Sequence, residues 1–188
     1  WMNTQRPEWN DANNALVGNG ASMVTLYYLR RYITFMQKLF QEIGRDQFSV
    51  SKEVYKFFND IAKTLDSFNC MVNGAISDID RRKFTNVLST AGSDYRTNLY
   101  NNGFSGDKTN LPTEDINSFL NNCLKHIDHS IKINERKDHL FHAYNLIKFD
   151  ENGGISIRHL YEMLEGQVSV LSSGYLSLKK MVVLLKAL

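Results

Sequence analysis

The stretch SMVTLYYLRRYITFMQKLFQEIG, residues 22–44, decides the fold that we expect. Its apolar side chains recur at steps of three and four residues, at Leu26, Leu29, Ile33, Met36, Phe40 and Ile43. This spacing is that of one face of an α-helix. Ser22 is a suitable N-cap and Gly44 a suitable stop for this helix. A second apolar stripe, at Tyr28, Tyr32, Phe35 and Leu39, predicts packing partners on more than one side.

The rest of the chain repeats the helical spacing, and no segment reads convincingly as a strand. Six further helices are predicted over residues 51–70, 78–100, 113–131, 136–148, 157–171 and 177–188. Ser51 and Ser177 are the expected N-caps of two of them. The connections are short, which favours antiparallel helical hairpins. We therefore expect an all-α protein in which residues 1–188 form a single helical domain.

The composition excludes some classes of protein. The 22 Lys and Arg residues exceed the 20 Asp and Glu residues by a net charge of +2, which is too small to predict a nucleic-acid partner. No apolar run approaches the roughly 20 residues of a membrane-spanning helix. The chain opens with Trp1 and lacks the regions of a signal peptide, so we expect the natural start to be missing and a cytoplasmic rather than a secreted location.

The stretch RPEWNDANN, residues 6–14, carries the candidate chemistry, and we call it the acidic stretch because it contains Glu8 and Asp11. Breaking a glycosidic bond requires a carboxylic acid that protonates the leaving oxygen, and Glu8 and Asp11 are the candidates. The Trp9 ring could stack on a sugar, and Asn10 and Asn14 could bind its hydroxyl groups. A loop of this composition also occurs merely to form turns and helix caps, and Trp9 could equally be a core aromatic residue.

The same stretch, with the helix that follows it, resembles the cellobiose phosphorylase family of inverting glycoside phosphorylases over residues 6–43. That family carries Asp-Trp-Asn-Asp-Gly-Met-Asn, then a Gly-x-Gly turn, a serine and a wide apolar helix. The matching positions are Trp9, Asn10, Asp11, Asn14, Gly18, Gly20 and Ser22. The chain departs from the pattern at Glu8, Ala12 and Asn13, where the family has Asp, Gly and Met. Beyond residue 44 the likeness is loose, as at Glu165-Gly166-Gln167.

The resemblance implies part of an (α/α)6 toroid of the six-hairpin glycosidase type. It also implies phosphorolysis of a β-linked glucosyl disaccharide with inversion, in which one carboxylic acid protonates the leaving oxygen and inorganic phosphate attacks as co-substrate. Asp11 matches the family without change and is the expected acid. Glu8 is the second choice because its extra methylene displaces the carboxyl group. Trp9, Asn10 and Asn14 are the expected substrate-binding residues, and no metal or other cofactor is expected.

The family's catalytic domain is about twice as long as this chain, within the upper range of domain sizes. The chain is therefore expected to be a C-terminal fragment that is inactive alone and has the remainder of its parent polypeptide as a partner, besides its oligosaccharide or disaccharide substrate. Two alternatives stay open. One is an inverting glycoside hydrolase of the same fold, and the other is a non-catalytic helical module that binds a partner helix.

Three other features are expected to be structural. Residues 150–155 resemble a calcium loop but offer Lys148 and His159 at its first and last ligand positions, so a turn between helices is expected. Four histidines form two pairs at a helical step of three, yet no zinc motif accompanies them; they are His126, His129, His139 and His142. Cys70 and Cys123 lie in apolar segments and are expected to be buried.

Overall fold

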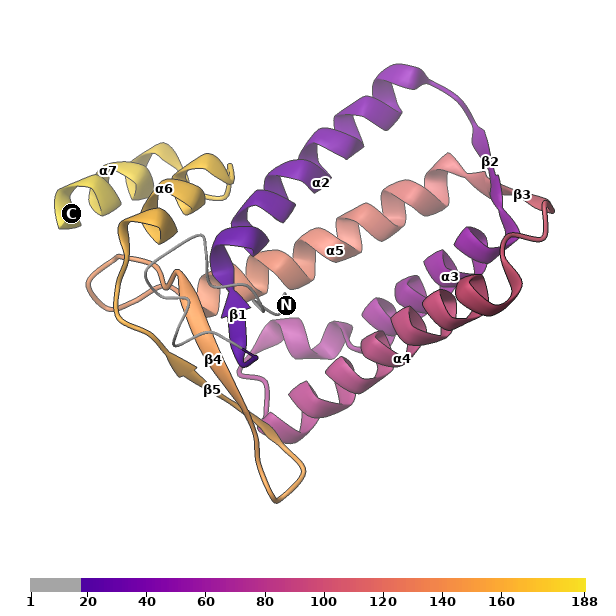
Figure 1. Cartoon of the computed structure of the whole chain (residues 1–188). Helices are drawn as coiled ribbons and strands as arrows, with labels where there is room; N and C mark the ends of the chain where they lie inside the picture. The colour runs from indigo at the N-terminus through magenta and orange to yellow at the C-terminus, as the bar shows by residue number, and fades with distance from the viewer. Residues whose placement is uncertain (1–17) are drawn as a thin grey trace. The chain divides into compact units, whose positions relative to one another are not determined.

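The computed structural model describes residues 18–188 and contains both helices and strands. Within this range there are six α-helices, one 3₁₀ helix and five strands (Figure 1). The chain divides into two compact units. Unit 1 comprises Trp1–Ile33 and Ile127–Leu188, and unit 2 comprises Thr34–His126. Helices α2 (Met23–Ile43) and α5 (Thr113–Ile133) each supply residues to both units.

Unit 1 contains a three-stranded antiparallel sheet in the order β1-β4-β5 (Figure 1). Its strands are β1 (Gly20–Ser22), β4 (Tyr144–Phe149) and β5 (Ile155–His159). The central strand begins with two residues that are almost fully buried, Tyr144 at 1% and Asn145 at 3% exposure. The first strand, β1, begins six positions after Asn14 in the sequence, and this sheet fixes the described residues from Gly20 onward.

Helices α6 (Leu164–Ser172) and α7 (Leu178–Ala187) complete unit 1. Its core contains large side chains with no more than 1% exposure, namely Tyr27, Ile131, Phe141, Tyr144, Ile155, Val170 and Leu184. The rings of Tyr27 and Phe141 meet edge to face with centroids 6.5 Å apart. The Tyr27 hydroxyl donates to the carbonyl oxygen of His142 at 2.9 Å, so this buried phenol is satisfied. The core therefore joins the first turns of α2 to the segment that leads into β4.

Arg30 links three segments of unit 1. Its Nε atom lies 2.6 Å from Oδ1 of Asp128 in α5, and its Nη1 atom donates to the Ser173 carbonyl at 3.0 Å, just after α6. The guanidinium also lies over the Tyr175 ring, 5.5 Å from its centroid. Its planar, multiply donating shape allows these contacts at once, which the point charge of a lysine does not.

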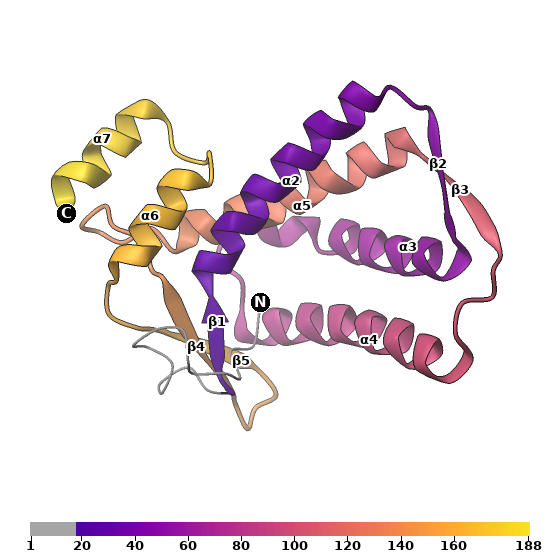
Figure 2. The same ribbon diagram turned by 45° about the horizontal axis from the view of Figure 1, so that its top comes forward.

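Unit 2 contains a two-stranded antiparallel ribbon and a helical hairpin. The elements are β2 (Gln47–Ser51), α3 (Lys52–Ser67), the 3₁₀ helix η1 (Asn69–Asn73), α4 (Asp78–Asn102) and β3 (Lys108–Pro112). Figure 2 shows α3 and α4 running along one another within this unit. Phe57 and Tyr95 stack between them with ring centroids 4.6 Å apart, and Phe58 of α3 packs on Phe119 of α5 at 4.8 Å. Aromatic pairs thus hold the helices of unit 2 together.

The expected all-α fold, and with it the (α/α)6 toroid, is wrong, because five strands form two antiparallel sheets. The predicted helix over 136–148 is a series of turns followed by β4, and the one over 157–171 begins in β5 and becomes helical only at Leu164. Residues 150–155 join β4 to β5 rather than two helices. A short apolar run fits a buried strand as well as a helix, and here pairing with β1, far away in the sequence, selects the strand.

Two further expectations concern membrane helices and the cysteines. Among the helices of residues 18–188, none is long and apolar enough to cross a membrane. Cys123 is partly buried, but Cys70 is exposed and the expectation of its burial was wrong. Cys70 lies in η1, a short helix without a buried residue.

Candidate functional site

The predicted site residues Glu8, Trp9, Asn10, Asp11 and Asn14 all lie outside the described residues. Of the positions that carry the family resemblance, the structure describes Gly18, Gly20 and Ser22. Gly20 and Ser22 lie in β1, and Gly18 lies in the turn before it.

Asn19 and β1 are held by backbone hydrogen bonds to β4. The amide of Ile147 donates to the carbonyl of Asn19 at 2.9 Å, and β1 then pairs with β4 from Gly20 opposite Leu146 onward. Gly18 has φ +78°, a conformation that glycine adopts without the steric penalty of other residues. Residues 19–22 are thus in a defined register with β4.

The start of α2 is also held by hydrogen bonds. The amides of Met23 and Val24 donate to the Ala143 carbonyl at 2.9 and 3.3 Å, and the amide of Thr25 donates to Ser22 Oγ at 3.1 Å. These are amides of the first helical turn, which lack partners within the helix and need partners from outside it. The predicted N-cap at Ser22 is confirmed. The acidic stretch is therefore followed by a strand and a helix that are both supported by the β4 region.

A buried polar network joins Asn145 in β4 to Asn134 and to His159 in the neighbouring strand β5. Asn145 Nδ2 donates to Asn134 Oδ1 at 2.9 Å, and Asn134 Nδ2 in turn donates to the carbonyl of Ser130 at 2.8 Å. Asn145 Oδ1 is 2.7 Å from Nδ1 of His159, in β5. Since this amide oxygen can only accept, the network assigns the proton of His159 to Nδ1.

His142 and His159 form a parallel pair of imidazoles with ring centroids 3.9 Å apart and an angle of 6° between the rings. Burial foremost, and then the neighbouring His159 and Arg136, lowers the pKa of His142 to about 4. Burial, and then the charge of Arg136, also lowers the pKa of His159. Both rings are therefore neutral at pH 7. Nδ1 of His142 is buried without a hydrogen-bond partner.

The histidine pair makes unit 1 sensitive to acid. The pKa of His142 is about 4 in the fold, against an ordinary histidine value of 6.5. The unfolded chain therefore takes up a proton first as the pH falls, and stability declines from about pH 7 to about pH 4. Because the ring is partly exposed, screening reduces the effect of this histidine to about 1–2 kcal/mol. Urea unfolding at pH 7.5 and 4.5 measures it.

A variant pair isolates this contribution from carboxylates that titrate over the same range. His142→Phe keeps a planar ring on His159 but cannot be protonated, so it should lose less stability than the native chain between the two pH values. His139→Asn is the control, because His139 is exposed and has φ +66°, which asparagine tolerates. Equal pH slopes for the native chain and His142→Phe would contradict the assignment.

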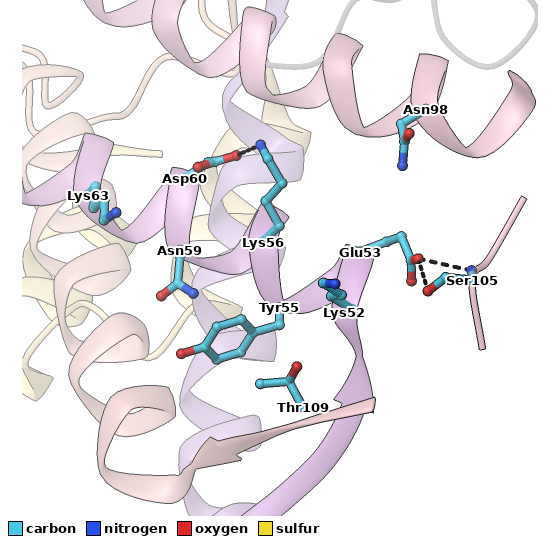
Figure 3. Close-up of a pocket in the computed structure, with 10 residues that line it drawn as sticks. All are labelled: Lys52, Glu53, Tyr55, Lys56, Asn59, Asp60, Lys63, Asn98, Ser105 and Thr109. Atoms are coloured by element: carbon cyan, nitrogen blue, oxygen red, sulfur yellow. Dashed lines mark hydrogen bonds and ion pairs between the residues drawn. The ribbon is translucent and has the colours of Figure 1, made fainter. Parts of the chain in front are cut away.

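A hollow of about 620 Å³ in unit 2 is a second candidate site (Figure 3). It lies along α3 and is bordered by α4 and by the segment leading into β3; its lining residues are Lys52, Glu53, Tyr55, Lys56, Asn59, Asp60, Lys63, Asn98, Ser105 and Thr109. We call it the α3 groove. It was not among the sites predicted from the sequence. Lys52, Lys56, Asn59 and Lys63 do follow a helical spacing, but such a stripe is also the ordinary solvated face of a helix.

The α3 groove contains fixed charges of both signs. Glu53 Oε1 accepts from the amide of Ser105 at 3.0 Å and from its hydroxyl at 2.6 Å. These hydrogen bonds, that of the hydroxyl foremost, lower the pKa of Glu53. The ammonium of Lys56 lies 2.7 Å from Oδ2 of Asp60, which raises the pKa of Lys56. Both pairs are marked in Figure 3.

Metal binding receives no support from the part of the chain that the structure describes. Among residues 18–188, no group of three or more His, Cys, Asp or Glu side chains could hold a metal ion. One of the four paired histidines, His126, makes contacts within the protein instead. The His126 ring stacks on Phe84 at 5.4 Å, and its Nε2 atom is 2.9 Å from the Leu65 carbonyl.

Comparison with known proteins adds no family. The sequence matches no protein-family model, and no curated protein matches it significantly. The functional interpretation therefore depends on the residues of this chain.

Proposed function

We propose that the chain is part of a carbohydrate-active enzyme that cleaves a β-linked glucosyl disaccharide by phosphorolysis with inversion. In this proposal Asp11 is the general acid and Glu8 is the second candidate. Support comes from the sequence of residues 6–14, whose carboxyl, indole and amide groups suit sugar recognition, and from its likeness to the cellobiose phosphorylases. Trp9 would stack on a sugar ring, and Asn10 and Asn14 would bind hydroxyl groups.

The supporting observation in the described residues is that the chain following this stretch is held in place from Asn19 onward. Hydrogen bonds to Ile147 and Ala143 of the β4 region hold both Asn19 and the first turn of α2. Catalytic groups work best when a rigid scaffold limits their positions, because misplacement by about 1 Å can cost about 100-fold in rate.

The proposed reaction uses one carboxylic acid. Asp11 transfers its proton to the glycosidic oxygen as the bond from that oxygen to the anomeric carbon breaks. An oxygen of inorganic phosphate attacks the anomeric carbon from the opposite face, which inverts its configuration and gives a sugar 1-phosphate and a free sugar. Phosphate is already a nucleophile, so no second carboxylate is needed to activate water. Since a charged sugar phosphate is retained inside a cell, a cytoplasmic location suits this reaction.

Hydrolysis is the alternative within the same chemistry. An inverting hydrolase needs a second carboxylate as general base, about 6.5–9.5 Å from the acid, to activate water. Glu8 would then have that role. The two reactions differ in their dependence on phosphate and in their product.

A non-catalytic interaction module is the second candidate function, and exposed apolar side chains favour it. On α7, Leu178, Val182 and Leu185 are 82%, 51% and 57% exposed and follow a helical spacing. Such a stripe suits contact with another apolar surface. In the enzyme proposal, the remainder of a longer polypeptide would cover it, and the chain alone would be inactive.

The test is an assay of the complete polypeptide with cellobiose and phosphate. We expect release of glucose 1-phosphate, and no glucose beyond the equimolar co-product. The same assay without phosphate should give no product; free glucose formed in its absence would favour the hydrolase. No product in either assay, with several β-linked disaccharides, would count against an enzyme and leave the interaction module.

A further inference from the structure

We propose that the α3 groove of unit 2 is a second carbohydrate-binding site, which takes a short neutral oligosaccharide. All the described residues that line it belong to unit 2. The choice of a saccharide, rather than of another polyhydroxyl compound, rests on the proposed function. The existence of the site rests on the groove itself.

The groove offers hydrogen-bond donors and acceptors in alternation along α3. Ammonium groups at Lys52, Lys56 and Lys63 alternate with the carboxylates of Glu53 and Asp60. An anionic ligand would match the lysines but meet both carboxylates, and a cationic ligand would have the opposite conflict. A hydroxyl group both donates and accepts, so a ligand with many hydroxyl groups matches both kinds of partner.

Neutral amides complete the polar lining from two helices. Asn59 projects from α3 beside Tyr55, and Asn98 projects from α4 on the side of α3 that carries Lys56 and Asp60 (Figure 3). An amide group presents an acceptor and two donors from one plane and can therefore bind two neighbouring hydroxyl groups. Amides placed on two helices give a polyol contacts at more than one point.

One acceptor in the wall is unsatisfied. Oε1 of Glu53 is held by Ser105, whereas Oε2 is shielded from solvent and has no hydrogen-bond partner. A ligand hydroxyl that follows a small rotation of this side chain would supply the donor.

Aromatic rings provide the apolar contacts that sugar C–H groups need. Tyr55 lines the groove itself. A neighbouring hollow of about 250 Å³ shares four lining residues with the groove and includes Phe57 and Tyr95, the stacked pair between α3 and α4. With about 620 Å³ for the groove alone, the space is of the size usual for small-molecule sites, about 300–1,000 Å³.

The experiment is a titration of the ¹⁵N-labelled full chain with cellotetraose, followed by amide chemical shifts. We expect shifts at residues 52–63, at Asn98 and at residues 105–109. Asn59→Ala and Asn98→Ala should each weaken binding about 10-fold, the effect of losing about 1.4 kcal/mol of hydrogen bonding. Tyr55→Ala should weaken it similarly through loss of ring contact. Far-UV circular dichroism checks that each variant is folded.

Matched controls lie on the same unit outside the groove. Tyr100 is 82% exposed on α4 and Asn101 is also exposed there, so Tyr100→Ala and Asn101→Ala should bind as the native chain does. Inorganic phosphate should shift none of the groove amides. The inference is overturned if cellotetraose shifts no groove amide, if Asn59→Ala and Asn98→Ala bind unchanged, or if phosphate alone produces the shifts.

The failure of this site and that of the proposed function can be told apart. Cellotetraose should shift the groove amides equally in the native chain and in Asp11→Asn, since this substitution changes none of the described residues that line the groove. Groove binding without phosphorolysis by the complete polypeptide would remove only the proposed function. Phosphorolysis without groove binding would remove only the second site.

Discussion

Asp11→Asn is expected to lower the release of glucose 1-phosphate from cellobiose by about 10²- to 10⁴-fold, the usual contribution of a general acid. The amide has nearly the volume of the carboxyl group but cannot give a proton to the leaving oxygen. The loss should appear in kcat as well as in kcat/KM, because proton transfer occurs in the transition state. Initial rates of the complete polypeptide at saturating phosphate measure both constants.

The leaving group provides the sharper readout. The leaving group of a β-glucosyl fluoride is the fluoride ion, which needs little protonation to depart. Asp11→Asn should therefore retain most of its activity on this substrate. A residue that only shaped the loop would reduce the activity on both substrates alike. Glu8→Gln distinguishes the two candidate acids, and it should cost about 10-fold or less if Asp11 is the donor.

Controls for this experiment come from exposed carboxylates outside the acidic stretch. Asp115→Asn lies in the first turn of α5 and Glu151→Gln in the turn between β4 and β5. Neither should change the rate. The assignment fails if Glu8→Gln abolishes activity on cellobiose but not on the fluoride, while Asp11→Asn leaves both rates near the native value. Glu8 would then be the acid.

The long helices could be predicted because their apolar period is sustained over several turns. The helix predicted from Ser22 to Gly44 is α2, and Gly44 follows its last residue with φ +62°. The predicted caps Ser51 and Ser177 accept from the amides of Val54 and Lys180, both at 3.4 Å. These signals are local, since a capping serine and the amide that it satisfies are three residues apart.

The strands could not be predicted in the same way because their partners are remote. Ser22 pairs with Tyr144, and Ser51 pairs with Lys108. β5, Ile155–His159, does alternate apolar and polar residues, which is the period of a half-buried strand. That signal was outweighed by the helical spacing expected for 157–171. The buried Asn145 is a polar residue whose place becomes clear only when Asn134 and His159 are beside it.

The two candidate sites differ in what the sequence reveals. Residues 6–14 stand out because their polar groups are consecutive. The α3 groove collects its groups from α3, α4 and the segment before β3, which lie up to 57 positions apart between Lys52 and Thr109. No spacing rule connects them. Only the pairing of β2 with β3 and the packing of α3 on α4 bring them together.

Gln167→Leu is expected to lower the free energy of unfolding of unit 1 by about 2–5 kcal/mol, since a buried polar group left without a partner costs about 1–3 kcal/mol. Gln167 is 1% exposed. Its Oε1 accepts from the Phe141 amide and its Nε2 donates to the Phe141 carbonyl, both at 2.8 Å. Leucine fits the volume but strands both backbone groups of Phe141 in the core. Hydrogen exchange of the Phe141 amide, with urea unfolding, measures the loss.

A matched glutamine makes the comparison specific. Gln37 is half-buried and donates to Asn121 at 2.7 Å in a solvent-exposed hydrogen bond of unit 2, so Gln37→Leu should change stability by no more than about 0.5 kcal/mol. Gln167→Glu keeps the acceptor for the Phe141 amide but places a carboxylate in the core against the Phe141 carbonyl, so at pH 7 it should lower stability at least as far as Gln167→Leu. If all three variants unfold at the native urea concentration, the amide contact contributes nothing.

The neighbouring glycine, Gly166, takes part in the same packing. A Cβ atom on Gly166 would lie 2.9 Å from Cβ of Ala143, whose carbonyl receives the first amides of α2. Gly166 and Gln167 therefore bring α6 close to the segment that supports the start of α2. If Gln167→Leu loosens the contact between α6 and this segment, hydrogen exchange at the Met23 and Val24 amides should increase as well. In Glu165-Gly166-Gln167, the likeness to the phosphorylases thus falls on residues whose contacts here are structural, and Gln167→Leu should lower activity only as far as it unfolds unit 1.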